Sequence, residues 1–409
     1  MRLLSARWVV PISSPPLAEG AVLLEDDGAT IAAVGGRNEL RRDHPAAVEE
    51  RADGILMPGL VNAHAHLELS VLAGRVPGGT GVVAWTRALM GRLAETTAPD
   101  EQIDKAACDA AVSAIGFGTA AIADVGNGVA GYRALAAVGL AGVFFHELVG
   151  SREAHTGDAL RDAAEERARI PVAERPTKVA AVAAPHAPYS VGPELLRRIF
   201  SRAAHDGVAT TIHVAEDPDE LLLLKEGRGA WPPVLRAMGV DPVERSPRQR
   251  PVEYLAGLGA FAGPRPPLLV HMVHADAADL AQAAAARATM VLCPRSNLHI
   301  GGRLPDVPTA LAAGVPLAIG TDSLASAPDL SMWGELATLA SRFPDVPPSR
   351  WLGAASEGGA LALGLDWAGA LRPGKRPGLL DVSPAGDTAE PERCLVSDNN
   401  PRIRWMAHA

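Results

Sequence analysis

The chain has 409 residues, more than a single hydrophobic core usually organises. We therefore expect one large α/β domain with a smaller domain beside it. The net charge is −9 and charges of both signs are scattered along the chain, so the composition does not favour binding to nucleic acid or to anionic lipid. A small-molecule substrate is the better prediction.

The cysteines and the N-terminus favour a cytoplasmic protein. Cys108, Cys293 and Cys394 lie far apart and form neither a CxxC pair nor an even disulfide framework. The opening MRLLSARWVVPISSPP holds only short apolar pieces, and no apolar run approaches the roughly 18 residues that a membrane helix needs. We expect a protein that is neither exported nor bound to a membrane.

Both ends of the chain carry short strand-like runs. VVPI, AVLLEDD and TIAAVGG are separated by Pro, Gly and Asp turns, and similar runs return from Leu371 onward. This pattern predicts a small composite β-sandwich domain made of residues 1–55 and 371–409. Residues 56–370 form the main domain in this interpretation.

Strand-like and helix-like segments alternate through the main domain. Most of the strand-like segments are apolar on both faces, as buried parallel strands are. They are 55–61, 119–125, 141–147, 178–184, 209–214, 268–272, 289–292 and 317–320. About eight such units predict a (β/α)₈ TIM barrel, with the chemistry at the carboxyl ends of the strands. A doubly wound open sheet is the alternative, but no GxGxxG follows an early strand. Long insertions at 151–176 and 221–263 could form lids.

Ligand-type side chains follow several of these strands. NAHAH places His64 and His66 one spacer apart, so both rings point to one side of an extended segment. Alone, such a pair is as well explained by surface or capping contacts. The fifth strand ends in TIHVAE, the sixth in LLVHMVHAD and the eighth in AIGTDSLAS, which add His213, Glu216, His271, His274 and Asp322. Three histidines and one carboxylate suit Zn²⁺ with a position left for water, and Fe²⁺ accepts the same ligands.

A bound divalent cation lowers the pKa of water from about 15.7 to about 7, so hydroxide becomes available at neutral pH. Asp322 can bind the metal through one oxygen and hold the water with the other. Glu216 is placed to move protons between the attacking water and the leaving group, and His271 to stabilise or orient the attacking oxygen. His274 is assigned to a supporting or solvated position.

The motifs PGLVNAHAH, HVAE, VHMVH, CPRSN and GTDS occur in this order between Pro58 and Ser323. In this set the chain resembles the amidohydrolase superfamily, in the branch of cytosine, guanine and adenosine-type deaminases with one catalytic metal. The resemblance implies His64, His66, His213 and Asp322 as metal ligands, and Glu216, His271 and Asp322 as catalytic residues. Two-metal relatives carry a lysine at the end of the fourth strand, whereas this strand ends AAPHAPYS. One metal is therefore expected.

PHAPYSVGPELL, HVAEDPDELLLL, CPRSNLHIGG and GTDSLAS are most similar to aminodeoxyfutalosine deaminases. The resemblance implies hydrolysis of the 6-amino group of an adenine-type nucleoside with a carboxyphenyl arm, on the futalosine route to menaquinone. His186 is the candidate beside the sugar or the ring, or else a capping histidine. Arg295 and Arg152 are the candidates for the carboxylate, although the first could instead brace the barrel mouth and the second be a solvated charge. Trp85 could wall the purine pocket or be core.

Other readings remain open. The substrate could be S-adenosylhomocysteine or methylthioadenosine, guanine, cytosine or a triazine, and the reaction could be ring opening of another cyclic amide. A non-enzymatic scaffold is the alternative outside catalysis, although all ligands and the proton shuttle are present. A homodimer is implied by the family resemblance alone.

Overall fold

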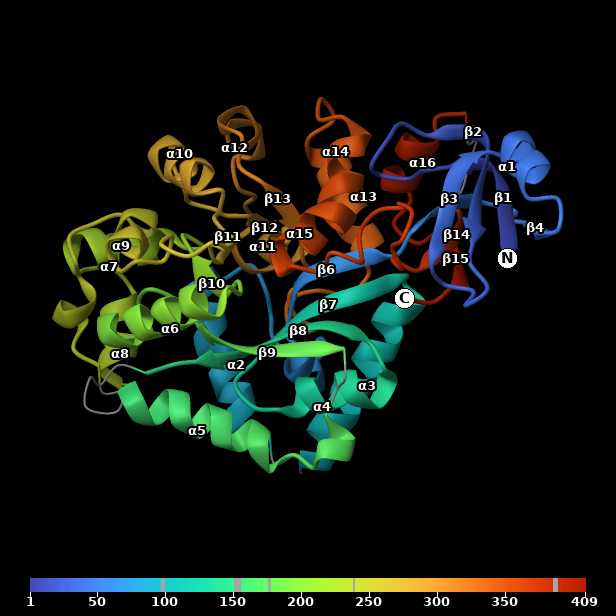
Figure 1. The fold of residues 1–409 in the computed structure, drawn as a ribbon. Helices are drawn as coiled ribbons and strands as arrows, with labels where there is room; N and C mark the ends of the chain where they lie inside the picture. Colours follow the sequence, from blue (N-terminus) through green and yellow to red (C-terminus); the bar gives the residue numbers. More distant parts are fainter. Residues whose placement is uncertain (97–99, 151–155, 176–177, 238–239, 385–388) are drawn as a thin grey trace.

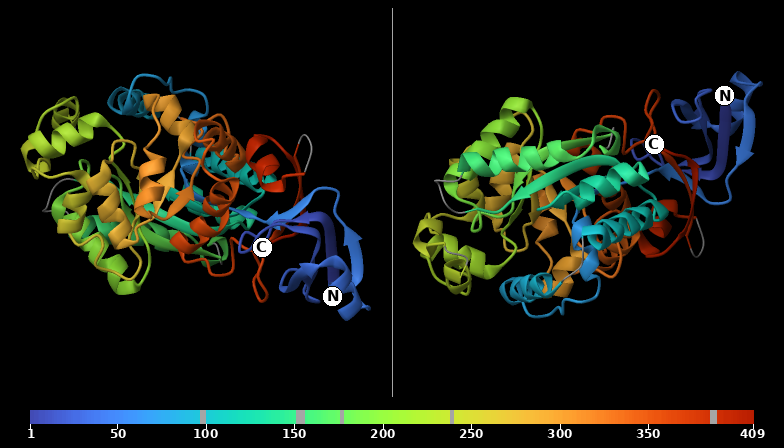
Figure 2. Two further views of the ribbon diagram at one scale, coloured as in Figure 1. Left: turned by 90° about the horizontal axis from the view of Figure 1, so that it is seen from above. Right: turned by 90° about the horizontal axis from the view of Figure 1, so that it is seen from below.

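The computed structural model describes the chain except residues 97–99, 151–155, 176–177, 238–239 and 385–388 (Figure 1). Strands from the two termini gather at one end of the molecule, and the alternating strands and helices make up the rest. Both views in Figure 2 show the blue N-terminal strands beside the red C-terminal segment, away from the helices coloured lime to yellow. The two ends of the sequence thus belong to one structural unit.

A seven-stranded sheet joins the termini, in the order β15-β14-β5-β1-β2-β3 with β4 paired to β1. Its strands are β1 (Arg2–Val9), β2 (Leu17–Leu24), β3 (Ile31–Gly36), β4 (Val48–Arg51), β5 (Ile55–Pro58), β14 (Leu379–Ser383) and β15 (Arg402–Ala407). Helices α1 (Arg37–Asp43) and α16 (Pro391–Ser397) lie between strands of this sheet along the chain. A domain boundary at residue 55 stays a prediction, and the pairing of β5 with β1 and β14 argues for moving it beyond Pro58.

The expected first barrel strand, 55–61, is split in the structure. β5 ends at Pro58 and a separate strand begins at Leu60. Gly59 lies at the break, in close contact with two neighbouring segments. A Cβ at this position would lie 2.5 Å from the Ala120 Cβ and 2.9 Å from the Pro377 carbonyl oxygen. Only glycine fits there, so the chain can leave the terminal sheet and enter the barrel within one residue.

The main body contains two four-stranded parallel sheets, β6-β7-β8-β9 and β10-β11-β12-β13. The strands are β6 (Leu60–Ala65), β7 (Thr119–Gly126), β8 (Ala141–Leu148), β9 (Val179–Pro185), β10 (Thr211–Val214), β11 (Leu268–His271), β12 (Met290–Leu292) and β13 (Leu317–Ile319). The sheets meet on both sides. A parallel bridge joins Ala65 to Asp322, and the His213 N–H donates to the His186 carbonyl oxygen at 2.9 Å. The eight strands therefore surround one interior, and the predicted (β/α)₈ fold is confirmed.

Helices surround these strands on the outside (Figure 1). Several begin with proline and end at a left-handed glycine, as α6 does between Pro193 and Gly207. The helices before β10 are η1 (Leu67–Leu72), α2 (Val82–Glu95), α3 (Asp100–Gly116), α4 (Ala130–Val138), α5 (Thr156–Arg169), η3 (Val172–Glu174) and α6 (Pro193–Asp206). The later ones are α7 (Pro218–Glu226), α8 (Trp231–Ala237), η4 (Pro242–Arg245), α9 (Pro251–Gly257), α10 (Ala277–Ala286), α11 (Pro294–Gly301), α12 (Val307–Ala313), α13 (Met332–Arg342), α14 (Pro348–Gly353), η5 (Ala354–Gly358) and α15 (Gly359–Leu363). Within the described ranges, no helix is both long enough and apolar enough to span a membrane.

Candidate active site

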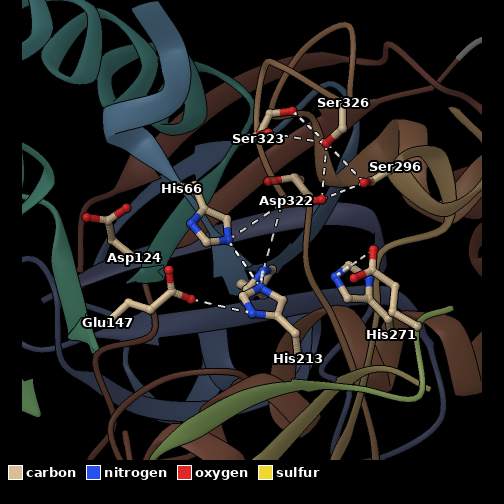
Figure 3. Close-up of polar contacts among 12 residues, drawn as sticks. His66, Asp124, Glu147, His213, His271, Ser296, Asp322, Ser323 and Ser326 are labelled. Atoms are coloured by element: carbon tan, nitrogen blue, oxygen red, sulfur yellow. Dashed lines mark hydrogen bonds and ion pairs between the residues drawn. The ribbon is translucent and has the colours of Figure 1, made fainter. Parts of the chain in front are cut away.

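Three imidazoles and one carboxylate meet at the carboxyl ends of β6, β10 and β13. His213 Nε2 lies 3.3 Å from both His66 Nε2 and His64 Nε2. Asp322 Oδ1 lies 3.8 Å from His64 Nε2 and 3.7 Å from His66 Nε2. All four side chains are buried, and Figure 3 shows His66, His213 and Asp322 turned toward one point. The structure therefore brings together the four residues that the sequence analysis proposed as metal ligands, and their role as ligands stays a prediction.

The spacing of the histidine nitrogens fits a tetrahedral cation, whereas Asp322 Oδ1 lies farther from them, at 3.7 and 3.8 Å. Zinc binds imidazole nitrogen at about 2.0–2.1 Å, so two ligands of a tetrahedral ion lie about 3.3–3.4 Å apart. Burial, which is the largest effect, lowers the pKa of His64 well below its usual value and those of His66 and His213 to about 4. The rings are thus neutral at physiological pH, which is the form that binds metals. These residues could hold one divalent metal ion.

The outward ring nitrogens are held in place. His213 Nδ1 donates to the His186 carbonyl oxygen at 2.9 Å, and His66 is hydrogen-bonded to the Val125 backbone. Donation through these nitrogens leaves the two Nε2 lone pairs free toward the centre. A second group, made of Glu147, His186 and His213, also has ligand atoms within 4.8 Å of one another. In this group His213 Nδ1 already donates a hydrogen bond to the His186 carbonyl oxygen, so it has no lone pair to offer a second metal ion.

Asp322 is fixed by two serine hydroxyls. Ser296 Oγ and Ser326 Oγ both donate to Oδ2, the second at 3.1 Å, so Oδ1 is the oxygen that faces the histidines. Burial opposes ionisation of Asp322, but the nearby His66 and His271 rings and the Ser296 hydroxyl lower its pKa overall. The carboxylate is therefore charged and oriented before any ligand binds.

Glu216 and His271 lie on the β10 and β11 side of the cluster. His271 Nε2 lies 3.6 Å from Glu216 Oε1, and Asn297 Nδ2 lies 2.9 Å from His271 Nδ1. Burial, with the charges of Asp322 and Asp217 adding to it, raises the pKa of Glu216 well above its usual value. Burial therefore favours the protonated form of this carboxyl group, which is the form that can give a proton to a bound molecule.

The backbone is strained at the ends of these strands. Ala215, His271, Met272 and Asp322 have φ values of 50°, 73°, 48° and 57°, in the left-handed region that residues other than glycine seldom adopt. The Ala215 and Glu216 N–H groups donate to the Glu220 carboxylate at 2.9 and 3.1 Å, which holds one of these turns. Strain of this kind persists where the surrounding structure maintains it, as at functional sites.

A cavity of about 820 Å³ opens from the cluster between α2 and α5. Trp85 and His186 line it, but Trp85 also belongs to a buried apolar cluster and His186 Nδ1 is 2.6 Å from Ser190 Oγ, so their contacts with a substrate stay predictions. Apolar side chains from α2 line its outer part, namely Leu89, Met90 and Leu93. The cavity is large enough for a nucleoside-sized ligand.

The prediction that Arg295 binds a substrate carboxylate is wrong. Its Nε donates to Glu335 Oε1 at 2.6 Å, one terminal nitrogen to Asp329 Oδ1 at 2.8 Å, and the other to the carbonyl oxygens of Asp329 and Ser331. Arg295 does not line the large cavity. It braces α13 and its preceding loop, which was the alternative reading. Arg152 lies outside the described residues.

Several residues around the site were missed from the sequence. Glu147 is the second-last residue of β8 and lines the cavity, and the rule that chemistry sits at strand ends could have found it. Burial raises its pKa to about 8, and the Glu68 and Asp322 charges act in the same direction. Ser296 and Ser326 lie inside the quoted motifs, but sequence alone does not show that they bond Asp322. His274 is half-buried and lines a smaller neighbouring cavity of about 370 Å³.

Comparison with curated proteins finds deaminases. The chain is 33% identical over 352 residues to aminodeoxyfutalosine deaminase of Deinococcus radiodurans, and the aligned region covers 82% of this chain and 80% of that protein. It is 29% identical over 389 residues to 5-methylthioadenosine/S-adenosylhomocysteine deaminase of Pelotomaculum thermopropionicum, and the aligned region covers 91% of this chain and 81% of that protein.

Solved structures share the fold over the whole chain. Helicobacter pylori aminofutalosine deaminase in complex with methylthio-coformycin has a TM-score of 0.85 at 19% identity and covers 100% of this chain and 99% of its own. An adenosine deaminase from Xanthomonas campestris with bound zinc has a TM-score of 0.74 at 23% identity, with 99% and 91% covered. Residues 55–392 match the amidohydrolase family by sequence. With the 33% identity above, this match shows that the chain belongs to the amidohydrolase family.

Proposed function

We propose that this protein is a metal-dependent hydrolytic deaminase that converts 6-aminodeoxyfutalosine to futalosine and ammonia. The observation that carries the proposal is the geometry of the cluster: three neutral imidazoles and one oriented carboxylate face one point, with the Glu216 carboxyl group and His271 beside it. The relative in Deinococcus radiodurans supports the substrate. A place in menaquinone synthesis, a cytoplasmic location and a homodimer belong to the same proposal.

In this proposal His64, His66, His213 and Asp322 hold one divalent metal, with Zn²⁺ preferred over Fe²⁺. When bound, such a metal would lower the pKa of water and so make hydroxide available at neutral pH. Three neutral imidazole nitrogens and a single charged oxygen are ligand types that suit Zn²⁺. Only one metal is proposed, because His213 Nδ1 is already bound to the His186 carbonyl oxygen.

The other residues bind the substrate and move protons. Glu216 gives its Oε proton to a ring nitrogen of the purine and then carries a proton from the attacking water to the leaving amino group, so that water and amine become carbonyl and ammonia. His271 orients the attacking oxygen, and Asn297 holds the His271 ring at 2.9 Å. Trp85 and His186 contact the nucleoside from the cavity wall.

A 5′-thioether nucleoside is the second candidate substrate. The outer cavity carries Leu89, Met90 and Leu93, an apolar wall that suits methylthioadenosine as well as an aryl arm. The curated relatives carry both names, which supports keeping both substrates.

Ammonia release from a panel of substrates tests the proposal. The panel is 6-aminodeoxyfutalosine, methylthioadenosine, S-adenosylhomocysteine, adenosine, guanine, cytosine and a triazine, assayed with zinc-loaded protein. We expect the highest kcat/KM on 6-aminodeoxyfutalosine. Turnover of guanine or cytosine without turnover of any aminopurine nucleoside would overturn the proposed function.

A further inference from the structure

The outer part of the large cavity exposes apolar side chains on one wall. Met90 and Leu93 from α2 and Val149 after β8 line the cavity, and they are 44%, 41% and 45% exposed. They are three of the eight large hydrophobic residues that are exposed in the described part of the chain. Exposed apolar side chains gathered at one hollow mark a place where a ligand binds. This wall therefore suits an apolar group that extends outward from a bound nucleoside.

The wall that α5 contributes carries charge. The residues of α5 that line the cavity recur at helical spacing and so lie on one face of the helix, namely Ala159, Asp162, Ala163, Glu166 and Arg169. Arg169 is the only lysine or arginine among the described residues that line this cavity. The cavity thus combines an apolar wall with a single permanent positive charge.

The Arg169 guanidinium has donors to offer a ligand. Its side chain is 77% exposed, and its Nη2 lies 3.7 Å from Glu165 Oε2, which is too long for a hydrogen bond. An exposed ion pair between neighbouring turns of one helix contributes little to stability. Arg169 can therefore turn to a ligand without breaking a buried contact.

The two acids of the same wall contact other residues. Asp162 Oδ1 accepts a hydrogen bond from Arg161 Nη2 at 3.3 Å, and Glu166 Oε2 lies 3.5 Å from His146 Nε2. Within the described ranges neither acid forms an ion pair with Arg169. Their carboxylates therefore do not occupy its donors.

A substrate arm with an apolar body and an anionic end fits these features, because a guanidinium can bind a carboxylate through two parallel hydrogen bonds. We propose that Arg169 binds the carboxylate at the end of the substrate's arm, while Met90 and Leu93 cover the apolar body of the arm. The inference rests on the proposed function and favours one of its two candidate substrates. The carboxyphenyl arm of 6-aminodeoxyfutalosine has both parts, whereas methylthioadenosine has only an apolar one. Arg169 thus takes the role that was expected of Arg295.

Arg169→Gln tests the carboxylate contact with two substrates that differ in charge at the end of the arm. They are 6-aminodeoxyfutalosine and its methyl ester, assayed with zinc-loaded protein beside methylthioadenosine, which has no carboxylate. Hydrogen bonds to a charged group correspond to about tenfold or more in kcat/KM, so wild type should prefer the acid to the ester by about that factor. In the variant this preference should fall to within about threefold, because the loss falls on the acid and far less on the ester and methylthioadenosine.

Arg161→Gln is the matched control, because Arg161 is exposed on the same helix and does not line the cavity. It should leave the preference for the acid unchanged. Met90→Ser should lower kcat/KM on the acid and the ester alike, since both carry the apolar body of the arm.

An unchanged preference for the acid in Arg169→Gln, or equal losses on all three substrates, would overturn the inference and leave Arg169 as a charge at the end of α5. Equilibrium dialysis of futalosine and its methyl ester makes the same comparison without turnover. If wild type deaminates no aminopurine nucleoside, the proposed function fails. If it deaminates methylthioadenosine but does not distinguish the acid from the ester, the assignment of Arg169 fails by itself.

Discussion

Removing Arg295 should damage stability and leave substrate choice unchanged. Glu335 is fully buried, and Arg295 gives it a backbone and a side-chain hydrogen bond. Burial raises the pKa of Glu335 to about 7 even with the arginine beside it. Arg295→Ala leaves that carboxyl without its cation and also frees the acceptors on Asp329 and Ser331. Removing one partner of a buried ion pair lowers the free energy of unfolding by about 3–5 kcal/mol.

Urea denaturation followed by circular dichroism measures this loss. Arg198→Ala is the control, because Arg198 is exposed and its pair with Glu194 should contribute less than about 1 kcal/mol. The double variant Arg295→Met with Glu335→Leu should recover most of the stability, since both charges are then gone. An Arg295→Ala protein as stable as wild type, with a loss confined to carboxylated nucleosides, would refute the structural role and restore the substrate role.

The remaining predictions concern the metal site. Glu216→Gln should retain its metal, measured by elemental analysis, and lose at least about 10²-fold in kcat; near-normal turnover would remove Glu216 from proton transfer. His213→Ala should lose metal together with activity, and full metal content would contradict its role as a ligand. A chelator should remove activity that one equivalent of Zn²⁺ per chain restores, and recovery only at two equivalents would contradict a single site. Gly320→Ala should lower metal affinity, because the new alanine Cβ would lie 2.6 Å from the His64 Cβ and 2.8 Å from the His64 carbonyl oxygen. Gly353→Ala is the control, because a Cβ at residue 353 meets no atom within 4 Å and should leave the metal content unchanged.

The sequence predicted that these residues lie together because each one is marked locally. His64, His213 and Asp322 each lie at the carboxyl end of a strand-like segment, and the barrel fold brings such strand ends together. Arg295 has no comparable local mark, since its role depends on Glu335 in a later helix. Glu147 was missed although it lies near the carboxyl end of an apolar strand, which is the same local mark that the other residues carry. The role of Arg295 depends on a pairing between distant segments, and a single sequence does not display such pairings.

The first and last strands of the barrel link closure of the fold to the chemistry. Thr321 and Asp322 both donate their N–H groups to the His64 carbonyl oxygen, at 2.9 and 3.1 Å, and Asn62 Nδ2 donates to Thr321 Oγ1 at 2.7 Å. The contact that closes the ring therefore also sets the distance between a histidine and the carboxylate of the proposed metal site. A cation that binds this closed arrangement and not an open one adds RT ln(1 + [M]/Kd) to its stability, about 4 kcal/mol at a thousandfold excess over Kd. The affinity for the metal and the stability of the closed barrel should therefore change in the same direction, because both depend on the same backbone contact.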